Sequence, residues 1–281
     1  MTLPSTRMIL FNAAGAVIGV SVLIGLIRPL LITPTPPPCS QRYQHSMTFQ
    51  LARAGSLLSA ADLQSALGGK DLGVIDNLSI GGEQDAPAPV SMRVQLPKGA
   101  ASPFATAERK GGMSFPWEPR SLERASAACV SYDVLLPAEF DFSRGGRLPG
   151  PIGSDGVGQD SFAARMLWRP GGGGAVAVRT LSAGDMRQST LGLDEFAFPR
   201  GRWFRIEQEV VLNTPKQANG KLTVWVDGAL VGERGDLVFR TDAAVAVSGV
   251  SAEVFYGGDD AGATVPRDTT VRLSPFELRW R

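Results

Sequence analysis

Short runs of alternating apolar and polar residues, each closed by a turn residue, constrain this chain more than any other feature of its sequence. Successive side chains of a β-strand point to opposite faces, so alternation is typical of a strand with one buried face. Val90–Leu96 ends in this way at Pro97, and Cys129–Leu136 ends at Pro137. Three further runs are predicted strands: Trp203–Leu212, then Leu222–Val226 between Asn219-Gly220 and Asp227-Gly228, and last Pro275–Trp280.

The pattern predicts an all-β domain. No glycine-rich loop leads from a strand into a long helix, and no strand–helix–strand rhythm appears, which argues against a parallel α/β sheet. Many antiparallel strands in 281 residues favour a two-sheet antiparallel β-sandwich, most of all a jelly roll. We expect this domain to span residues 40–281. A short lead-in helix is predicted after Ser59, with Asp62 at its third position and Gly68-Gly69 at its end.

An apolar segment precedes the domain. Residues 8–27 carry no charge and are followed by Arg28 and Pro29. As a helix they would be about 30 Å long, enough to cross a bilayer. A cleaved signal peptide is the alternative, but it would have a shorter apolar core and a small-residue cleavage site. We therefore predict an uncleaved transmembrane signal anchor over residues 1–32, followed by a stiff proline-rich linker over residues 33–39.

Charge and cysteine content limit the partners. The formal net charge is +1, so nothing favours a general affinity for nucleic acid. The two cysteines are Cys39 and Cys129. In an oxidising compartment they can pair and join the end of the linker to a core strand; the alternative is two separate thiols. No cluster of Cys, His or carboxylate residues has the spacing of a zinc site, and we expect no metal and no cofactor.

A series of short motifs covers roughly residues 92–281. The most informative are Gly145-Gly-Arg-Leu-Pro-Gly150 and Arg165-Met-Leu-Trp-Arg169. None is specific alone, but their order and gaps resemble the family 14 polysaccharide lyases, the group that contains alginate and glucuronan lyases. The other motifs are Ser131-Tyr-Asp-Val134, Phe140-Asp-Phe142, Leu212-Asn-Thr-Pro215, Val224-Trp-Val-Asp-Gly228 and Phe255-Tyr-Gly-Gly-Asp259.

The resemblance implies a jelly roll whose groove holds an anionic polysaccharide, which the lyases cleave by β-elimination at a uronate. A cation neutralises the uronate carboxylate, because the charge of the carbanion spreads onto that group in the transition state. The family uses a Lys in a Gly-Gly-Lys-Leu-Pro-Gly motif, a Ser and an Arg two apart on the next strand, and two Tyr two apart on the strand after. Residues two apart share a face of a sheet, so these groups meet in one groove.

One of those five positions carries the family residue here. Arg165 matches the family Arg, whereas Arg147 stands in place of the Lys and Ala163 in place of the Ser. Counting along the next strand puts the two Tyr positions near Ala177 and Arg179. Arg147 can still pair with a carboxylate, but Arg179 cannot act as a base because a guanidinium stays protonated in proteins. The resemblance thus implies a groove that binds acidic sugar but lacks the family's proton-transfer groups.

Further side chains are weaker candidates for a role in the site. The single histidine, His45, lies in the lead-in, which disfavours a Ser-His-Asp triad, and Asp259-Asp260 could bind calcium or be a solvated turn. Nearby aspartates could supply a replacement base, although ordinary loop residues are the alternative. In a sandwich most tryptophans are core, so we expect at most one in the groove, with Trp168 as the candidate. The aspartates are Asp155, Asp160 and Asp185, and the tryptophans are Trp168, Trp203 and Trp225.

The sequence therefore predicts a membrane-anchored domain that binds a uronate-containing polysaccharide at the cell envelope through Arg147, Arg165 and Arg179, with impaired catalysis. One alternative is a working polysaccharide lyase, or another glycan-cleaving enzyme, with a replaced base. A second alternative is a structural subunit of a polysaccharide synthesis or export assembly. The carbohydrate-type fold favours export, so we expect the domain in the periplasm or outside the cell, held at the membrane by residues 8–27.

Overall fold

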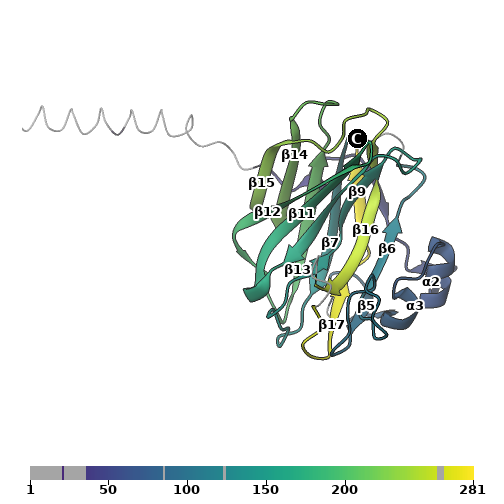
Figure 1. Ribbon diagram of the computed structural model, residues 1–281. Coiled ribbons are helices and arrows are strands. Elements are labelled where there is room, and N and C mark those ends of the chain that lie inside the picture. Colours follow the sequence, from purple (N-terminus) through teal and green to yellow (C-terminus); the bar gives the residue numbers. More distant parts are fainter. Residues whose placement is uncertain (1–20, 22–35, 85, 123–124, 258–262) are drawn as a thin grey trace, which may run out of the picture. The chain divides into compact units, whose positions relative to one another are not determined.

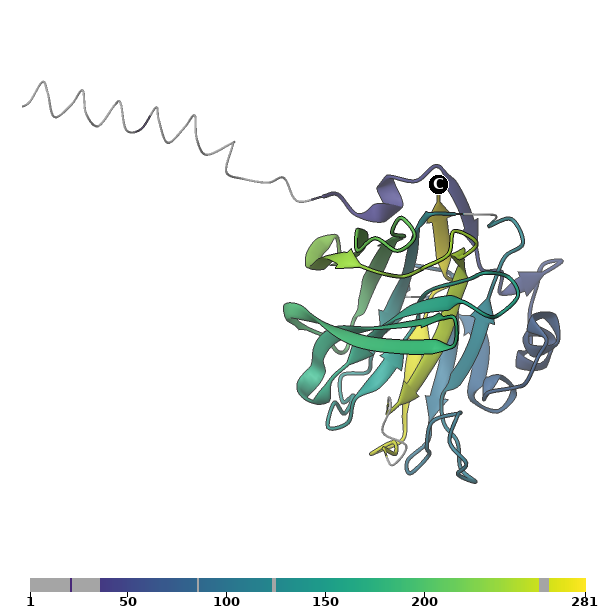
Figure 2. The same ribbon diagram turned by 45° about the horizontal axis from the view of Figure 1, so that its top comes forward.

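Two large antiparallel sheets lie face to face in the computed structural model, which describes residues 21, 36–84, 86–122, 125–257 and 263–281 (Figures 1 and 2). The residues from Pro37 to Arg281 form one compact unit. Every pairing between the named strands is antiparallel. The predicted all-β, two-sheet sandwich is confirmed.

The larger sheet, called the nine-stranded sheet below for its strands among the described residues, has the order β15-β14-β13-β7-β17-β5-β4, with β18 beside β7 and β1 beside β18. Its strands are β1 (His45–Thr48), β4 (Leu78–Gly82), β5 (Val90–Leu96), β7 (Ala127–Leu135), β13 (Trp203–Val211), β14 (Gly220–Val226), β15 (Ala229–Leu237), β17 (Thr269–Leu273) and β18 (Glu277–Trp280).

The second sheet, called the seven-stranded sheet on the same basis, has the order β12-β11-β10-β8-β16-β6, with β9 paired to β10 and β16. Its strands are β6 (Met113–Trp117), β8 (Gly146–Leu148), β9 (Gly150–Ser154), β10 (Ser161–Trp168), β11 (Gly173–Ser182), β12 (Asp185–Ala197) and β16 (Ala246–Tyr256). The smaller elements are β2 (Ala52–Arg53), β3 (Ser56–Leu57), α2 (Ala60–Leu67), α3 (Val74–Asn77), η1 (Cys39–Gln41) and η2 (Pro170–Gly172).

Turn residues define the strand ends as the sequence predicted, with one exception. Asp227 and Gly228 join β14 to β15 and have φ angles of 49° and 79°, the left-handed conformation that a two-residue hairpin turn of this kind requires. Asn219-Gly220 does not form such a turn. Instead, the Asn219 side chain accepts a hydrogen bond from the backbone N–H of Thr214 at 2.8 Å and closes a longer loop between β13 and β14.

The core fills the space between the sheets, and β7 shows why the alternation predicts it. Val130, Tyr132 and Val134 point into the core and are fully buried. Two buried polar groups bridge the sheets: the Tyr132 hydroxyl donates to the Pro149 carbonyl at 2.9 Å, and the Gln208 amide donates to a carbonyl of β10 at 3.3 Å. Such bonds offset the cost of burying polar atoms and fix how the sheets are stacked.

The lead-in helix is confirmed as α2. Ser59 caps it and forms a reciprocal capping box with Asp62, and Leu63 is buried against the domain. Figure 1 places α2 and α3 together beside β5 and β6. Among the described residues, no helix is long and apolar enough to cross a membrane. The predicted anchor, residues 8–27, lies outside the described residues apart from Ser21.

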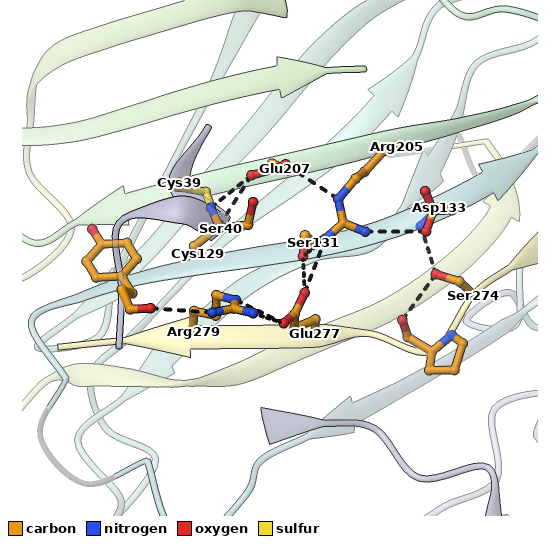
Figure 3. A network of polar contacts seen from close by, with 12 residues as sticks. Cys39, Ser40, Cys129, Ser131, Asp133, Arg205, Glu207, Ser274, Glu277 and Arg279 are labelled. Atoms are coloured by element: carbon orange, nitrogen blue, oxygen red, sulfur yellow. Dashed lines mark hydrogen bonds and ion pairs between the residues drawn. A yellow bond between two sulfur atoms is a disulfide. The ribbon is translucent and has the colours of Figure 1, made fainter. Parts of the chain in front are cut away.

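Cys39 and Cys129 form a disulfide, which settles the alternative that the sequence left open. It fastens residues 38–48, here called the strap, to the face of the nine-stranded sheet that points away from the core. Ser40 donates its backbone N–H to Glu207 at 2.9 Å, and Arg42 pairs with Glu209 at 2.8 Å. Figure 3 shows the disulfide beside Glu207 and the polar network that continues across this face. The strap also covers a small apolar cluster of Cys39, Tyr43, Ala127, Cys129 and Trp225.

Candidate functional site

Strand pairing brings four of the predicted site positions together on the seven-stranded sheet. In the β10–β11 pair, Ala163 lies opposite Arg179, and Arg165 lies opposite Ala177. Opposite residues of an antiparallel pair point to the same side, as do residues two apart on one strand. This pairing also fixes the register beyond Gly171–Gly174, the glycine run at which β11 begins. The four side chains share the side of the sheet that faces away from the core, called the groove face below.

Arg147 reaches the groove face from β8. It lies opposite Leu167 of β10, two residues from Arg165, and opposite Phe255 of β16. Three neighbouring strands therefore contribute arginines to one surface, as the motif resemblance implied. The Arg147 and Arg165 side chains are 13% and 16% exposed, so both lie partly sunk in the sheet surface, whereas Arg179 is exposed.

The glycines around Arg147 are required by close packing. A Cβ atom on Gly146 would stand 1.9 Å from the Trp168 ring, and one on Gly150 would stand 2.0 Å from the carbonyl oxygen of Ala164. Both distances are far below van der Waals contact, so any side chain at either position would push β8 or β9 away from β10. The Gly-Gly-Arg-Leu-Pro-Gly motif thus positions Arg147 by allowing its strand to lie close to its neighbours.

Glu253 lies between two of the arginines. Its carboxylate pairs with Arg165 Nε at 2.8 Å and with Arg147 Nη1 at 3.4 Å. Ser251, two residues earlier on β16, donates its hydroxyl to the same carboxylate at 3.0 Å and accepts from Arg165 Nε at 3.3 Å. The Glu253 side chain is only 3% exposed. These contacts hold the two guanidinium groups in fixed positions on the groove face.

Sequence reasoning missed Glu253. The available signal was a single charged residue in the otherwise apolar and small-residue run Val250–Tyr256, since a carboxylate in a buried strand needs a partner. That signal shows that a partner exists but does not say which of the arginines it is.

The charges of the patch act on one another. Burial lowers the pKa of Arg165 from its usual value; Glu253 opposes this shift, and the guanidinium groups of Arg147 and Arg179 add to it. The three guanidinium groups come from neighbouring strands and lie on one face, so the cations repel one another. The three arginines outnumber the two carboxylates placed beside them, Glu253 and the rim residue Glu118.

A groove of about 340 Å³ opens beside this patch. At its rim the carboxylate of Glu118 accepts a hydrogen bond from the hydroxyl of Ser248 at 2.6 Å. Arg165 and Arg179 line it together with the small side chain of Ala163, which leaves room where the family has a Ser. The lining residues are Glu118, Ile152, Gly153, Ser154, Ser161, Phe162, Ala163, Arg165, Arg179, Leu181 and Ser248.

The three tyrosines lie elsewhere. Tyr43 is on the strap, and the hydroxyl groups of Tyr132 and Tyr256 donate to the backbone carbonyls of Pro149 and Asp141 at 2.9 and 2.7 Å. Burial is the main cause that raises the pKa of all three phenols above the usual value. All three are buried, and none lines the groove.

The structure corrects the expectation that Trp168 contacts sugar. Trp168 is 1% exposed and packs edge-on against Phe140 and Tyr256, because even-numbered residues of β10 point into the core while Ala163 and Arg165 point out. Trp225 is buried under the strap, and Trp203 is half-buried on the nine-stranded sheet. None of the three predicted tryptophans lines the groove.

The three candidate aspartates do not line the groove either. Asp155 accepts backbone N–H bonds within its own loop. Asp160 accepts from the backbone of Ala183 at 2.7 Å, and Asp185 pairs with Arg187 at 3.0 Å at the end of the β11–β12 hairpin. Each has the loop role that was the alternative in the sequence.

No metal site with free ligands is seen in the described part of the chain. The group of possible ligands found there is Cys39, Cys129 and Glu207, and its two sulfur atoms are already bonded to each other. His45 is exposed on β1 and stacks on Trp280. The calcium candidate, Asp259-Asp260, lies outside the described residues.

Comparison with known proteins agrees with this geometry. A model of the family described as Polysaccharide lyase 14 matches residues 84–276, which is more than half of the chain. The chain belongs to the polysaccharide lyase 14 family. No curated protein matches it significantly.

Solved structures of polysaccharide lyases share its fold. The PL-14 alginate lyase of Aplysia kurodai has a TM-score of 0.67 and 19% identity, over 85% of this chain and 99% of that one. Alginate lyase vAL-1 from Chlorella virus has a TM-score of 0.61 and 20% identity, over 73% and 90%. A variant of alginate lyase Aly36B, solved in complex with an alginate tetrasaccharide, has a TM-score of 0.58 and 18% identity, over 84% and 97%. These likenesses show the fold, a jelly-roll sandwich of two antiparallel sheets.

Proposed function

We propose that this polysaccharide lyase 14 domain binds an acidic, uronate-containing polysaccharide along its groove face, without the proton transfer that the family's lyases perform. The observation that carries this proposal is the convergence of Arg147, Arg165 and Arg179 on one face from three neighbouring strands. Aly36B, whose structure holds an alginate tetrasaccharide, has the same fold and supports the substrate class.

The arginines suit a carboxylate ligand. In the part of the chain that the structure describes, Arg165 uses its Nε for Glu253 and Ser251, which leaves its two Nη groups for a ligand. Arg179 is exposed at the groove and donates its Nε to the Met186 sulfur. Guanidinium groups bind carboxylates bidentately, and mutual repulsion of the cations is relieved when an anion binds between them.

Catalysis by the family's route is disfavoured, because the residues at the family's acid and base positions cannot transfer a proton. The two Tyr positions are Ala177 and Arg179, a methyl group and a fixed cation, neither of which can take the C5 proton at neutral pH. Ala163 removes a hydroxyl from the same surface. Loss of a positioned acid or base typically slows a reaction about 10²–10⁴-fold.

One observation favours a second candidate, a lyase with a replaced base. Glu118 is a carboxylate at the groove, bonded there to the Ser248 hydroxyl, and a carboxylate within reach of the C5 proton could remove it. The same face would then neutralise the uronate. The two candidates differ in turnover and agree on the ligand.

The cellular setting belongs to the same proposal. We place the domain outside the cytoplasm, at the membrane through residues 8–27, with residues 33–39 as a spacer. The Cys39–Cys129 disulfide supports an oxidising compartment, because such bonds persist outside the cytosol. The charge-free length of residues 8–27 supports the anchor.

Binding is tested by calorimetric titration of the purified protein with alginate, with glucuronan and with a neutral glucan. We expect the two polyuronates to bind and the neutral glucan not to bind, and we expect Arg179→Ala to weaken binding about tenfold through one lost charged hydrogen bond. Higher salt should weaken it further. Arg234→Ala is the matched control, because Arg234 is exposed on β15 and pairs with Asp236.

Equal affinity for the neutral glucan, unchanged in Arg179→Ala, would exclude the proposed ligand class. The same samples also test the lyase candidate, since β-elimination leaves a conjugated C4–C5 double bond that absorbs ultraviolet light. We expect no growth of this absorbance. A saturable increase that is abolished by Glu118→Gln would establish the lyase instead.

A further inference from the structure

Phe104 is a large aromatic side chain presented to solvent. It is 55% exposed and lies in the segment between β5 and β6, within a turn that the Ala105 N–H closes on the Ser102 carbonyl at 3.0 Å. Pro103 precedes it and restricts the turn. The segment is tied at its base, where Ala101 and Lys110 form an isolated β-bridge. The ring is therefore held on a short, constrained turn.

The ring lies at one end of the groove face. Phe104 meets Phe255 edge-on, with ring centroids 5.6 Å apart. Phe255 lies opposite Arg147 in the β8–β16 pair, and the Arg147 guanidinium carbon is 5.7 Å from its ring centroid. Since Phe255 itself is buried, the aromatic surface open to solvent at this point is that of Phe104.

The end of the groove face at Phe104 lies farther from Arg165 than the length of one sugar ring. Ser251, Glu253 and Phe255 follow one another on one face of β16, and Ser251 contacts Arg165. At about 3.3 Å per residue, Ser251 and Phe255 are about 13 Å apart along the strand. A ligand ring held at Arg165 is thus not the ring that would reach Phe104.

Exposed apolar residues are common on soluble proteins, and exposure alone indicates nothing. Phe104 differs in its position. Polar contacts run along the groove face from Arg165 through Glu253 to Arg147, and the flat apolar ring of Phe104 lies at the end of this row. A pyranose ring has an apolar face of C–H bonds that packs against an aromatic ring, while its carboxylate needs a cation. Arg147 and Phe104 supply both requirements side by side.

We infer that Phe104 is a stacking platform for a second pyranose ring of the bound polysaccharide, with Arg147 beside it for that ring's carboxylate. This inference rests on the proposed function. It assigns the site at least two subsites, one at Arg165 and Arg179 and one at Arg147 and Phe104. It predicts that a longer uronate chain binds better than one that fills the Arg165 end alone.

The experiment compares oligouronates of increasing length by calorimetric titration of the full protein and of two variants. Phe104→Leu keeps an apolar cover over Phe255 and removes the flat ring, whereas Phe104→Trp keeps a ring. We expect Phe104→Leu to weaken binding of long oligomers about 3- to 10-fold and to leave a disaccharide and the salt dependence unchanged. Phe104→Trp should bind long oligomers about as well as wild type does. Leu57→Ala is the control, since Leu57 is exposed to a similar degree on β3.

The outcomes separate this inference from the proposal on which it rests. If wild type binds polyuronate and Phe104→Leu binds long oligomers equally well, the stacking platform is wrong and the proposed function stands. Equal weakening for the disaccharide and for long oligomers would also overturn it, because the second subsite would then not exist. If wild type binds no polyuronate, both are wrong. Thermal unfolding of each variant verifies that the fold is intact.

Discussion

At the scale of single residues, Glu253 determines how the groove face is arranged. Its carboxylate is almost fully buried and joins Arg147, Arg165 and Ser251. Without it, two partly buried guanidinium groups would face each other with less compensating charge, which is costly in a medium less polar than water. We therefore regard Glu253 as a positioning residue that keeps the cations in place for a ligand.

Replacing Glu253 by Gln tests this role. The change removes the negative charge and keeps the shape, so we expect the free energy of unfolding to fall by about 3 kcal/mol, as when one partner of a buried ion pair is lost. Urea-induced unfolding measures it. Glu118→Gln is the control, because Glu118 is exposed and should change stability by less than about 0.5 kcal/mol. Equal effects of the two variants would contradict the positioning role.

At the scale of elements, the strap covers part of the outer face of the nine-stranded sheet. The groove lies on the outer face of the other sheet. η1 holds the disulfide and the bond from Ser40 to Glu207, and β1 extends the sheet by pairing with β18. Figure 3 shows that the network goes on through Arg205, which contacts Ser131, Asp133 and Glu277. The strap thus covers Trp225, supplies Arg42 and Tyr43 as partners of the buried Glu209, and gives Glu207 a partner in addition to Arg205.

Removing the disulfide tests the strap. The two cysteines are 90 residues apart, and closing a loop of that length restricts the unfolded chain by about 4 to 5 kcal/mol. We expect the double variant Cys39→Ser with Cys129→Ser to lose most of that stability in urea unfolding under oxidising conditions. The variant should unfold alike with and without reductant, unlike wild type. Arg234→Ala, which removes an ion pair with Asp236 that is exposed on both sides, should cost about 1 kcal/mol or less.

At the scale of the whole molecule, the two sheets have different tasks. The seven-stranded sheet presents its arginines on the groove face, while the nine-stranded sheet carries the strap and Cys39, the last residue of the proline-rich linker. A pull on the linker would act first on Cys39 and, through its disulfide, on β7. A tethered domain benefits from such a fixed attachment, in line with the anchor that we propose.

Retention of the apolar segment tests the anchor. We expect the mature protein to keep residues 8–27, to fractionate with membranes, and to need detergent for extraction, because about 20 apolar residues span a bilayer. Amino-terminal sequencing of the purified mature protein measures the retained end. A mature chain that begins beyond residue 30 would show a cleaved signal instead, and the domain would then be released rather than tethered.

The sequence by itself determined the features that depend on neighbours in the chain. Alternation in Val90–Leu96 predicted β5 to the residue, the Ser59 cap predicted α2, and Asp227-Gly228 predicted a tight hairpin. Local geometry decides each of these, since strand alternation, capping and turn angles involve residues a few positions apart. The family motifs added which strands meet and which arginines share a face.

Only the tertiary structure decided which residues far apart in the sequence meet. Alternation says that Trp168 and Arg165 point to opposite sides, but not that Trp168 faces the core. It does not say that Glu253 lies against Arg147 and Arg165, or that Phe104 lies over Phe255. Those partners are far apart in the sequence, and their contacts depend on strand order and register, which are set by the packing of the whole sandwich.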